Sequence, residues 1–304
     1  PLLGGVYAGR ADEMSAAATL PQLSRTHRSV LAAARAALPA PTASPKPVFA
    51  TVRGGLGRLP AAVAAEVARL GGEIVTGRPV RRLERTVTGW RVIHGATTDE
   101  RVVEADAVII AAPAAPTARL LRDVAPAAAA DLAAIETASM AVITTAWHAD
   151  DLPPTTASGY LVPAVTGRPV KAVTFASVKW AHLAAAENVV VVRCSIGRHG
   201  DVEQLQRDDA ELVAAAVGEL REYAGFRGAP IASRVSRWGG GLPQYAVGHL
   251  DRVRRIRAAV AAVPGLAVCG ATYDGVGVPA CIRTGRDAAT ALLGDQGVTD
   301  ALTP

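Results

Sequence analysis

The sequence predicts a mixed fold of the α/β type with α+β character, arranged in two lobes. Its 304 residues are 50% hydrophobic and 19% charged, which is enough apolar material for a sizeable core and too little charge for disorder. Helical and strand patterns alternate toward both ends of the chain. Between them, segments 139–147, 170–178 and 189–196 are rich in Val, Ile and Thr, which predicts strands of a second sheet.

The first part of the chain predicts helices followed by a linker. Residues 11–38 consist largely of good helix formers, and Pro21 divides them because proline cannot continue a helix. The proline-rich segment 40–47 predicts a connection without regular structure.

A strand, a glycine turn and a helix are expected next. Residues 48–52 are β-branched or aromatic at most positions and predict a short strand, which ends in the glycine turn 53–57. The helix is expected from Arg58 to Leu70, because its apolar residues recur at helical spacing. They fall on one face: Leu59, Val63, Val67 and Leu70.

Four strands are expected between this helix and the middle sheet. Segment 71–77 ends the helix and opens a strand, and segments 79–85 and 90–94 form a hairpin that turns near Thr88–Gly89. The run 108–112 follows Asp106 without a polar residue, which predicts a strand buried on both faces. Pro113 and Pro116 end that strand, and a short helix follows.

The last third predicts alternating helices and strands. A long helix is expected within Asp201–Phe226, a strand at Pro230–Trp238 and a basic amphipathic helix at His249–Val263. A short buried strand at Leu266–Cys269 and a helix at Pro279–Leu293 complete the chain. No internal repeat is evident.

Composition narrows the classes of partner. The net charge of +5 fits either a plain basic surface or attraction to a polyanionic small molecule or an anionic membrane surface. With 4% aromatic residues the chain has no stacking platform for nucleic acid. The scattered cysteines 194, 269 and 281 indicate reduced thiols in a cytoplasmic protein, and no metal-ligand spacing is present. No signal peptide or transmembrane segment is predicted.

The segment around Gly275 is the most informative. Gly275-x-Gly277-x-x-Ala280 matches a relaxed dinucleotide fingerprint between a strand and a helix, but the second parallel strand that such a unit needs does not follow. A second interpretation uses the same residues: glycines that permit close backbone approach, Pro279 at the first helical position, and free amides facing an electron-rich group such as a flavin. A tight turn packed on the sheet is the plain alternative.

Five segments in order resemble one family. They are residues 1–23, 48–64, 105–121, 237–253 and 265–289, and the block RWGGGLPQYAVGHLDRV is the most specific of them. The chain resembles the C-terminal two thirds of the protoporphyrinogen/coproporphyrinogen III oxidases, within the flavin-containing amine oxidase superfamily. The family's N-terminal βαβ unit has no counterpart here, so a fragment of a longer protein is expected.

The resemblance implies a doubly wound FAD-binding domain truncated at its N-terminus, an antiparallel substrate domain and part of a helical region. The segments expected are 1–47 for the end of the helical region, 48–114 and 263–304 for the FAD domain, and 115–262 for the substrate domain.

The resemblance also implies a non-covalently bound FAD. Val80 matches the position where the backbone meets the adenine, and Trp238 and Gln244 lie in a block beside the cofactor. The turn under the flavin ring is Val276, Gly277 and Val278. A plain strand residue is the alternative for Val80, and a core aromatic is the alternative for Trp238.

The implied reaction removes six electrons from a porphyrinogen, with hydride passing to the flavin and oxygen becoming hydrogen peroxide. No catalytic side chain is assigned, because positioning over the flavin suffices. Arg237, Lys171 and Lys179 flank strands of the substrate lobe and are candidate carboxylate anchors, with solvated surface charges as the alternative.

Coproporphyrinogen III is the substrate expected, because the chain is basic and its predicted helical segment 11–38 has no bulky apolar face for membrane insertion, which favours a soluble enzyme and the more soluble tetra-acid. Protoporphyrinogen IX, another amine oxidase-type reaction, a non-catalytic porphyrin-binding role and an inactive fragment are the alternatives. Peripheral membrane contact and transfer of the product to a ferrochelatase are compatible with this interpretation.

Overall fold

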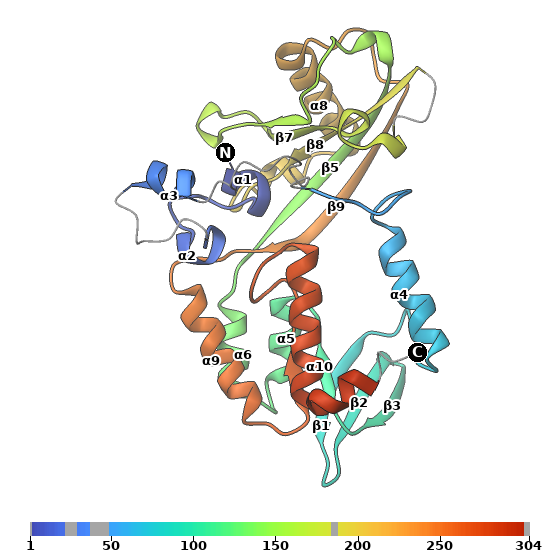
Figure 1. The fold of residues 1–304 in the computed structure, drawn as a ribbon, viewed down its shortest axis with the longest axis vertical. Helices are drawn as coiled ribbons and strands as arrows, with labels where there is room; N and C mark the ends of the chain where they lie inside the picture. The colour runs from blue at the N-terminus through green and yellow to red at the C-terminus, as the bar shows by residue number, and fades with distance from the viewer. Residues whose placement is uncertain (1, 22–28, 37–48, 184–187, 301–304) are drawn as a thin grey trace. The chain divides into compact units, whose positions relative to one another are not determined.

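The computed structural model describes residues 2–21, 29–36, 49–183 and 188–300 (Figure 1). The chain forms two compact units, and three separate stretches of sequence build each of them. Unit 1 comprises Pro1–Ala8, Ser29–Thr76 and Ser139–Gly239, and unit 2 comprises Gly9–Arg28, Gly77–Ala138 and Gly240–Pro304. The four-part division at residues 47, 114 and 262 is a different partition and stays a prediction.

A five-stranded sheet dominates unit 1. Its order is β6-β7-β8-β5-β9, and β5, β6, β7 and β8 pair antiparallel. The strands are β5 (Thr137–His148), β6 (Gly159–Leu161), β7 (Val170–Phe175), β8 (Val189–Ile196) and β9 (Ala232–Pro243). The antiparallel sheet is as predicted, but β7 is shorter than the expected 170–178, because α7 (Ala176–Lys179) takes over after Phe175.

One face of this sheet packs against helix α8 (Asp209–Ala224). Alternate strand residues such as Ile143, Val173 and Cys194 form a buried core with Leu212 and the helix residues that follow it. The helix lies within the predicted range Asp201–Phe226, and a capping box formed by Asp208 and Glu211 fixes its start. It ends at Gly225, whose φ of 71° suits glycine.

The remaining helices of unit 1 are α1 (Leu2–Tyr7), α3 (Val30–Ala36) and α4 (Arg58–Arg69). The predicted helix α4 is confirmed, yet it buries no side chain, and Val63 is 55% exposed. The strands expected at 48–52 and 71–77 were wrong for the described residues 49–52 and 71–77, which pair with no strand. Much of the expected 11–38 helix lies outside the described residues or is irregular.

Unit 2 contains two small sheets. The first is antiparallel, in the order β1-β2-β3, with β1 (Val80–Arg85), β2 (Trp90–Ala96) and β3 (Asp99–Ala105). The predicted hairpin is confirmed, and the Thr86 amide donates to the Gly89 carbonyl across the turn. The second sheet is a parallel pair of β4 (Val108–Ile110) and β10 (Leu266–Val268). Strand β4 was expected to be buried on both faces, but Ile109 is 40% exposed, whereas its partner Ala267 on β10 is buried against α10.

Helices surround the parallel pair. They are α5 (Ala114–Leu121), α6 (Pro126–Ala133), α9 (His249–Ala261) and α10 (Val278–Asp300), and α2 (Ala16–Thr19) lies beside α9 (Figure 1). Their core contains Trp90, Leu121, Leu132, Ile256 and Tyr273. Short 3₁₀ turns lie in unit 1 at Ala149–Asp151, Ala164–Thr166, Ala181–Leu183 and Glu203–Leu205. None of the helices in the described ranges is both long and apolar enough to cross a bilayer.

Candidate functional site

A small cavity of about 120 Å³ lies at the carboxyl ends of β4 and β10. Residues 111–114 follow β4 and line one side, and Ala271 and Thr272 follow β10 and line another. Gly240 and Gly241 contribute backbone without side chains. Ligands of parallel sheets bind beyond the carboxyl ends of the strands, so this cavity in unit 2 is the candidate site.

The β10–α10 turn, residues 270–277, borders the cavity. Gly270 has a φ of 110° and Gly275 a φ of 131°, a region that residues with a side chain rarely adopt. A Cβ on Gly275 would also lie 3.0 Å from the Ala280 Cβ. The Thr284 hydroxyl accepts from the Gly270 amide at 3.0 Å and donates to the Cys281 carbonyl at 3.0 Å, which ties the turn to α10.

The turn delivers the chain to the N-terminus of α10. The Cys281 amide donates to the Gly277 carbonyl at 3.0 Å, and the helix begins at Val278, one residue before the predicted Pro279. Gly277 is exposed, and a Cβ added to it would meet only the Pro279 Cδ, at 3.8 Å. The first amides of a helix have no intrahelical partner and lie at the positive end of its dipole. Gly277 and Val278 therefore suit an electron-rich group.

The site residues expected from the sequence lie in different places. Val276, Gly277 and Val278 form the end of the turn, whereas Val80 opens strand β1 in the other sheet of unit 2 and is 43% exposed. Gln244 is 5% exposed. Its backbone N–H donates to the Glu136 carbonyl at 2.9 Å, and its side-chain Nε2 donates to the Leu242 carbonyl at 3.1 Å.

Trp238 belongs to unit 1 and is 58% exposed, so it is not an ordinary core aromatic. The structure therefore brings the turn residues together within unit 2, and Trp238 belongs to unit 1.

Tyr245 and His249 are two site residues that the sequence did not predict. The Tyr245 hydroxyl donates to the Ala271 carbonyl at 2.5 Å and accepts from the Gly275 amide at 2.9 Å. The His249 ring stacks on the Tyr245 ring, with centroids 4.0 Å apart, and its Nε2 lies 3.0 Å from the Tyr273 carbonyl. The only signal was their place in the specific block 237–253, because all three contacts with the turn join residues far apart in sequence.

Burial favours the neutral protonation state of the His249 imidazole. The residue is 1% exposed, and this burial holds the pKa of the imidazole below its ordinary value. Because a carbonyl only accepts, Nε2 carries the proton of the neutral ring. Nδ1 has no hydrogen-bond partner in the described part of the chain.

The candidate carboxylate anchors differ in how they are held. Arg237 is tied to the chain, donating to Asp209 and to the carbonyls of Leu205 and Arg207. Lys179 lies over the Phe49 ring, with Nζ 4.7 Å from its centroid. Each of these cations thus has a partner within unit 1.

Lys171 is the exception among the three. It is 1% exposed, and its Nζ has no hydrogen-bond partner among the residues described. Burial, with a contribution from Arg198, lowers its pKa to about 8. It is therefore not a solvated surface charge.

Arg193 is a cation that sequence analysis did not single out. It pairs with Thr144 on β5 and Thr174 on β7, and its neighbours Val192 and Cys194 are buried against α8. Strand alternation therefore puts Arg193 on the opposite face of the sheet, where it is exposed. Its guanidinium forms no hydrogen bond or ion pair with another described residue.

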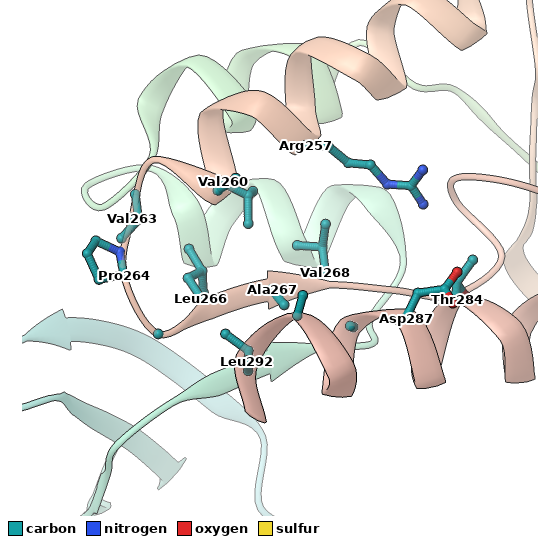
Figure 2. A pocket seen from close by; sticks show the side chains of 14 residues that line it. Arg257, Val260, Val263, Pro264, Leu266, Ala267, Val268, Thr284, Asp287 and Leu292 are labelled. Carbon is teal, nitrogen blue, oxygen red and sulfur yellow. The ribbon is translucent and has the colours of Figure 1, made fainter. Parts of the chain in front are cut away.

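A larger cavity, with a volume of about 460 Å³, lies between α9, β10 and α10. Figure 2 shows side chains that line it. Consecutive strand residues Leu266, Ala267 and Val268 line it, so the unpaired edge of β10 faces it. Most of the other lining side chains are apolar, including Val260 and Leu292. None of the residues expected at the site lines this cavity, and we do not take it as the reaction site.

Comparisons with known proteins point to one family. The family of "Flavin containing amine oxidoreductase" matches residues 1–293. Coproporphyrinogen III oxidase of Mycobacterium tuberculosis is 38% identical over 96% of this chain, and protoporphyrinogen oxidase of Macaca fascicularis is 30% identical over 97% of it. The chain spans 62% and 65% of their lengths, so it corresponds to about three fifths of each relative.

A crystal structure from Exiguobacterium, named provisionally as a protoporphyrinogen oxidase, is similar over nearly the whole chain. Its TM-score is 0.76 at 28% identity, covering 99% of this chain and 62% of that protein. Cyclohexylamine oxidase of Brevibacterium oxydans has a TM-score of 0.58 at 15% identity, covering 78% of this chain and 52% of that protein, and shows likeness of fold alone.

Proposed function

The chain belongs to the flavin containing amine oxidoreductases, whose cofactor is FAD, and we propose that the protein oxidises coproporphyrinogen III to coproporphyrin III. One observation carries the proposal. A strand–turn–helix unit opens on a cavity at the carboxyl ends of parallel strands, in a chain 38% identical to a coproporphyrinogen III oxidase.

The residues at the candidate site fit a flavin. The turn that lines the cavity at Ala271 and Thr272 continues through Gly275, whose φ is positive, to the start of α10. Small residues such as Ala111 and Gly240 leave the cavity walls without bulky side chains. We assign Val276, Gly277 and Val278 to the flavin ring. Val80, Gln244 and Trp238 stay proposed cofactor contacts.

When bound, the flavin would accept hydride from the porphyrinogen and return the electrons to oxygen. In total, six hydrogens leave the substrate, and three oxygen molecules become three molecules of hydrogen peroxide. None of the described residues that line the cavity has a titratable side chain. Orienting the substrate and excluding water are therefore the contributions that we assign to the protein.

The sheet face opposite α8 supports a carboxylate-bearing substrate. Its residues Thr144, Thr174 and Ser195 are half-buried, and Arg193 lies among them without a partner in the described chain. An unpaired guanidinium forms strong bidentate hydrogen bonds with a carboxylate. We therefore propose that this face receives the porphyrinogen and that Arg193 binds one propionate.

Comparison of the two porphyrinogens tests the proposal. We expect the complete protein to carry a flavin absorbance spectrum and to show a higher kcat/KM for coproporphyrinogen III than for protoporphyrinogen IX in detergent-free buffer. Protoporphyrinogen IX is the second candidate, favoured by the Macaca relative, and a preference for it would overturn the choice. Absence of flavin would contradict the enzymatic proposal itself. A cytoplasmic location and delivery of the product to a ferrochelatase are parts of the same proposal.

A further inference from the structure

The β10–α10 turn has no regular secondary structure between Gly270 and Gly277, and within it the Tyr273 amide donates to the Gly270 carbonyl at 3.4 Å. Side chains bind further backbone groups of the turn. Two buried rings do so. Tyr245 contacts the Ala271 carbonyl and the Gly275 amide, and His249 contacts the Tyr273 carbonyl. The three backbone groups that the rings bind belong to residues 271, 273 and 275, so the two rings contact the turn along most of its length.

The two rings form a single rigid support. They stack at an interplanar angle of 14°, and both residues are 1% exposed. The backbone of Tyr245 is itself fixed, because its carbonyl accepts from the Ser15 amide at 2.8 Å. His249 is the first residue of α9, which sets the position of its ring from the other side.

We infer that Tyr245 and His249 are positioning residues for the cofactor: they fix the β10–α10 turn and thereby the direction of the first amides of α10 toward the flavin. The inference rests on the proposed function. It assigns the pair no step in the chemistry, because neither side chain lines the cavity. Their hydroxyl and imidazole N–H are occupied by backbone groups of the turn.

Tyr245→Phe is the decisive variant, because it keeps the stacked ring and removes the hydroxyl. In the complete protein we expect the FAD dissociation constant, measured by flavin fluorescence, to rise about tenfold. The flavin midpoint potential should fall, because misdirected amides stabilise the reduced flavin less. In the flavin-free protein, hydrogen exchange at residues 270–277 should accelerate, since the Gly275 amide loses its acceptor.

Two further variants separate positioning from general destabilisation. His249→Gln retains an N–H donor and should bind FAD more tightly than His249→Leu, which retains none. Tyr160→Phe is the matched control, because it removes a partly buried hydroxyl that donates to Glu219 at 3.0 Å in unit 1. We expect it to lower the melting temperature and leave FAD affinity and potential unchanged.

The results of these measurements separate the positioning role of Tyr245 and His249 from the proposed function. If Tyr245→Phe matches the wild type in FAD affinity, potential and exchange at the turn, the positioning role is wrong while the proposed function stands. Equal FAD loss in Tyr245→Phe and Tyr160→Phe would also overturn it. A wild-type protein that binds no flavin would contradict the proposed function together with the inference.

Discussion

Arg168 and Glu219 form an ion pair with 3.3 Å between Nη1 and Oε1, and the Glu219 side chain is only 4% exposed. The Tyr160 hydroxyl donates to the same carboxylate at 3.0 Å. Removing one member of a buried ion pair leaves the other charge uncompensated. We expect Glu219→Ala to lower the free energy of unfolding by about 3 kcal/mol in urea denaturation, and Glu219→Gln by less. Glu222→Ala, at an exposed position of the same helix, is the control, and an equal loss there would refute the argument.

Lys171 predicts an unusual pH dependence of stability. Its folded pKa of about 8 lies below the ordinary 10.5, so between these values the unfolded chain binds more protons and stability rises with pH. Below pH 8 the cost of burying the charge is present in full. Lys171→Met should therefore stabilise the protein at pH 7, by up to about 3 kcal/mol, and the gain should disappear toward pH 10.5. A gain that does not change with pH would show that packing causes it.

Gly277 and Gly275 predict opposite results. Gly277→Val should leave the free energy of unfolding within about 0.5 kcal/mol, since no neighbour crowds the position, yet it should abolish flavin retention. Gly275→Ala should lower stability by about 1 kcal/mol or more, because of its φ of 131°. Gel filtration followed by absorbance at the flavin band measures retention. Stoichiometric FAD in Gly277→Val would remove Gly277 from the site.

Arg193 tests the proposed substrate face. Arg193→Gln should raise the KM for coproporphyrinogen III about tenfold, the effect of one lost charged hydrogen bond, while kcat and the melting temperature stay unchanged. Arg237→Gln is the matched control, because Arg237 is bound to Asp209 and neighbouring carbonyls. It should lower stability and leave KM unaltered. The reverse pattern would move the substrate away from this face.

The unpaired edge of β10 predicts self-association of the 304-residue chain. Among the described residues this edge has no partner strand and faces an apolar cavity, and such an edge is a template for another strand. Analytical ultracentrifugation should show association that increases with concentration, and Ala291→Lys, inside the cavity, should reduce it. Leu293→Lys lies outside the cavity lining and is the control. An equal reduction by both would indicate nonspecific adhesion.

Local patterns predicted much of the fold. The hairpin of β1 and β2 and the strands β5, β7 and β8 could be read from β-branched residues and turn signals, because these elements form their ladders with near neighbours or bury one face. The strands expected at 48–52 and 71–77 have the same local composition. They failed because a strand also needs a partner, and composition does not record one.

Local sequence patterns predicted only part of the candidate site. The turn at Gly275 and Gly277 is visible because glycine spacing reports backbone conformation directly. Tyr245 and Arg193 gave no such signal. The role of Tyr245 depends on a contact with Ala271, and the direction of Arg193 depends on the register of β8 with two other strands.

The pairing of Val108 with Leu266 has a consequence for the nascent chain. Roughly 150 residues, including most of unit 1, must be synthesised after β4 before its partner β10 leaves the ribosome, which takes about 8–30 s at ordinary elongation rates. Until then β4 presents an open apolar edge. Unit 1 also needs its last stretch before its sheet closes, so neither unit can be completed early, and chaperone occupancy during translation should be long for a protein of this size.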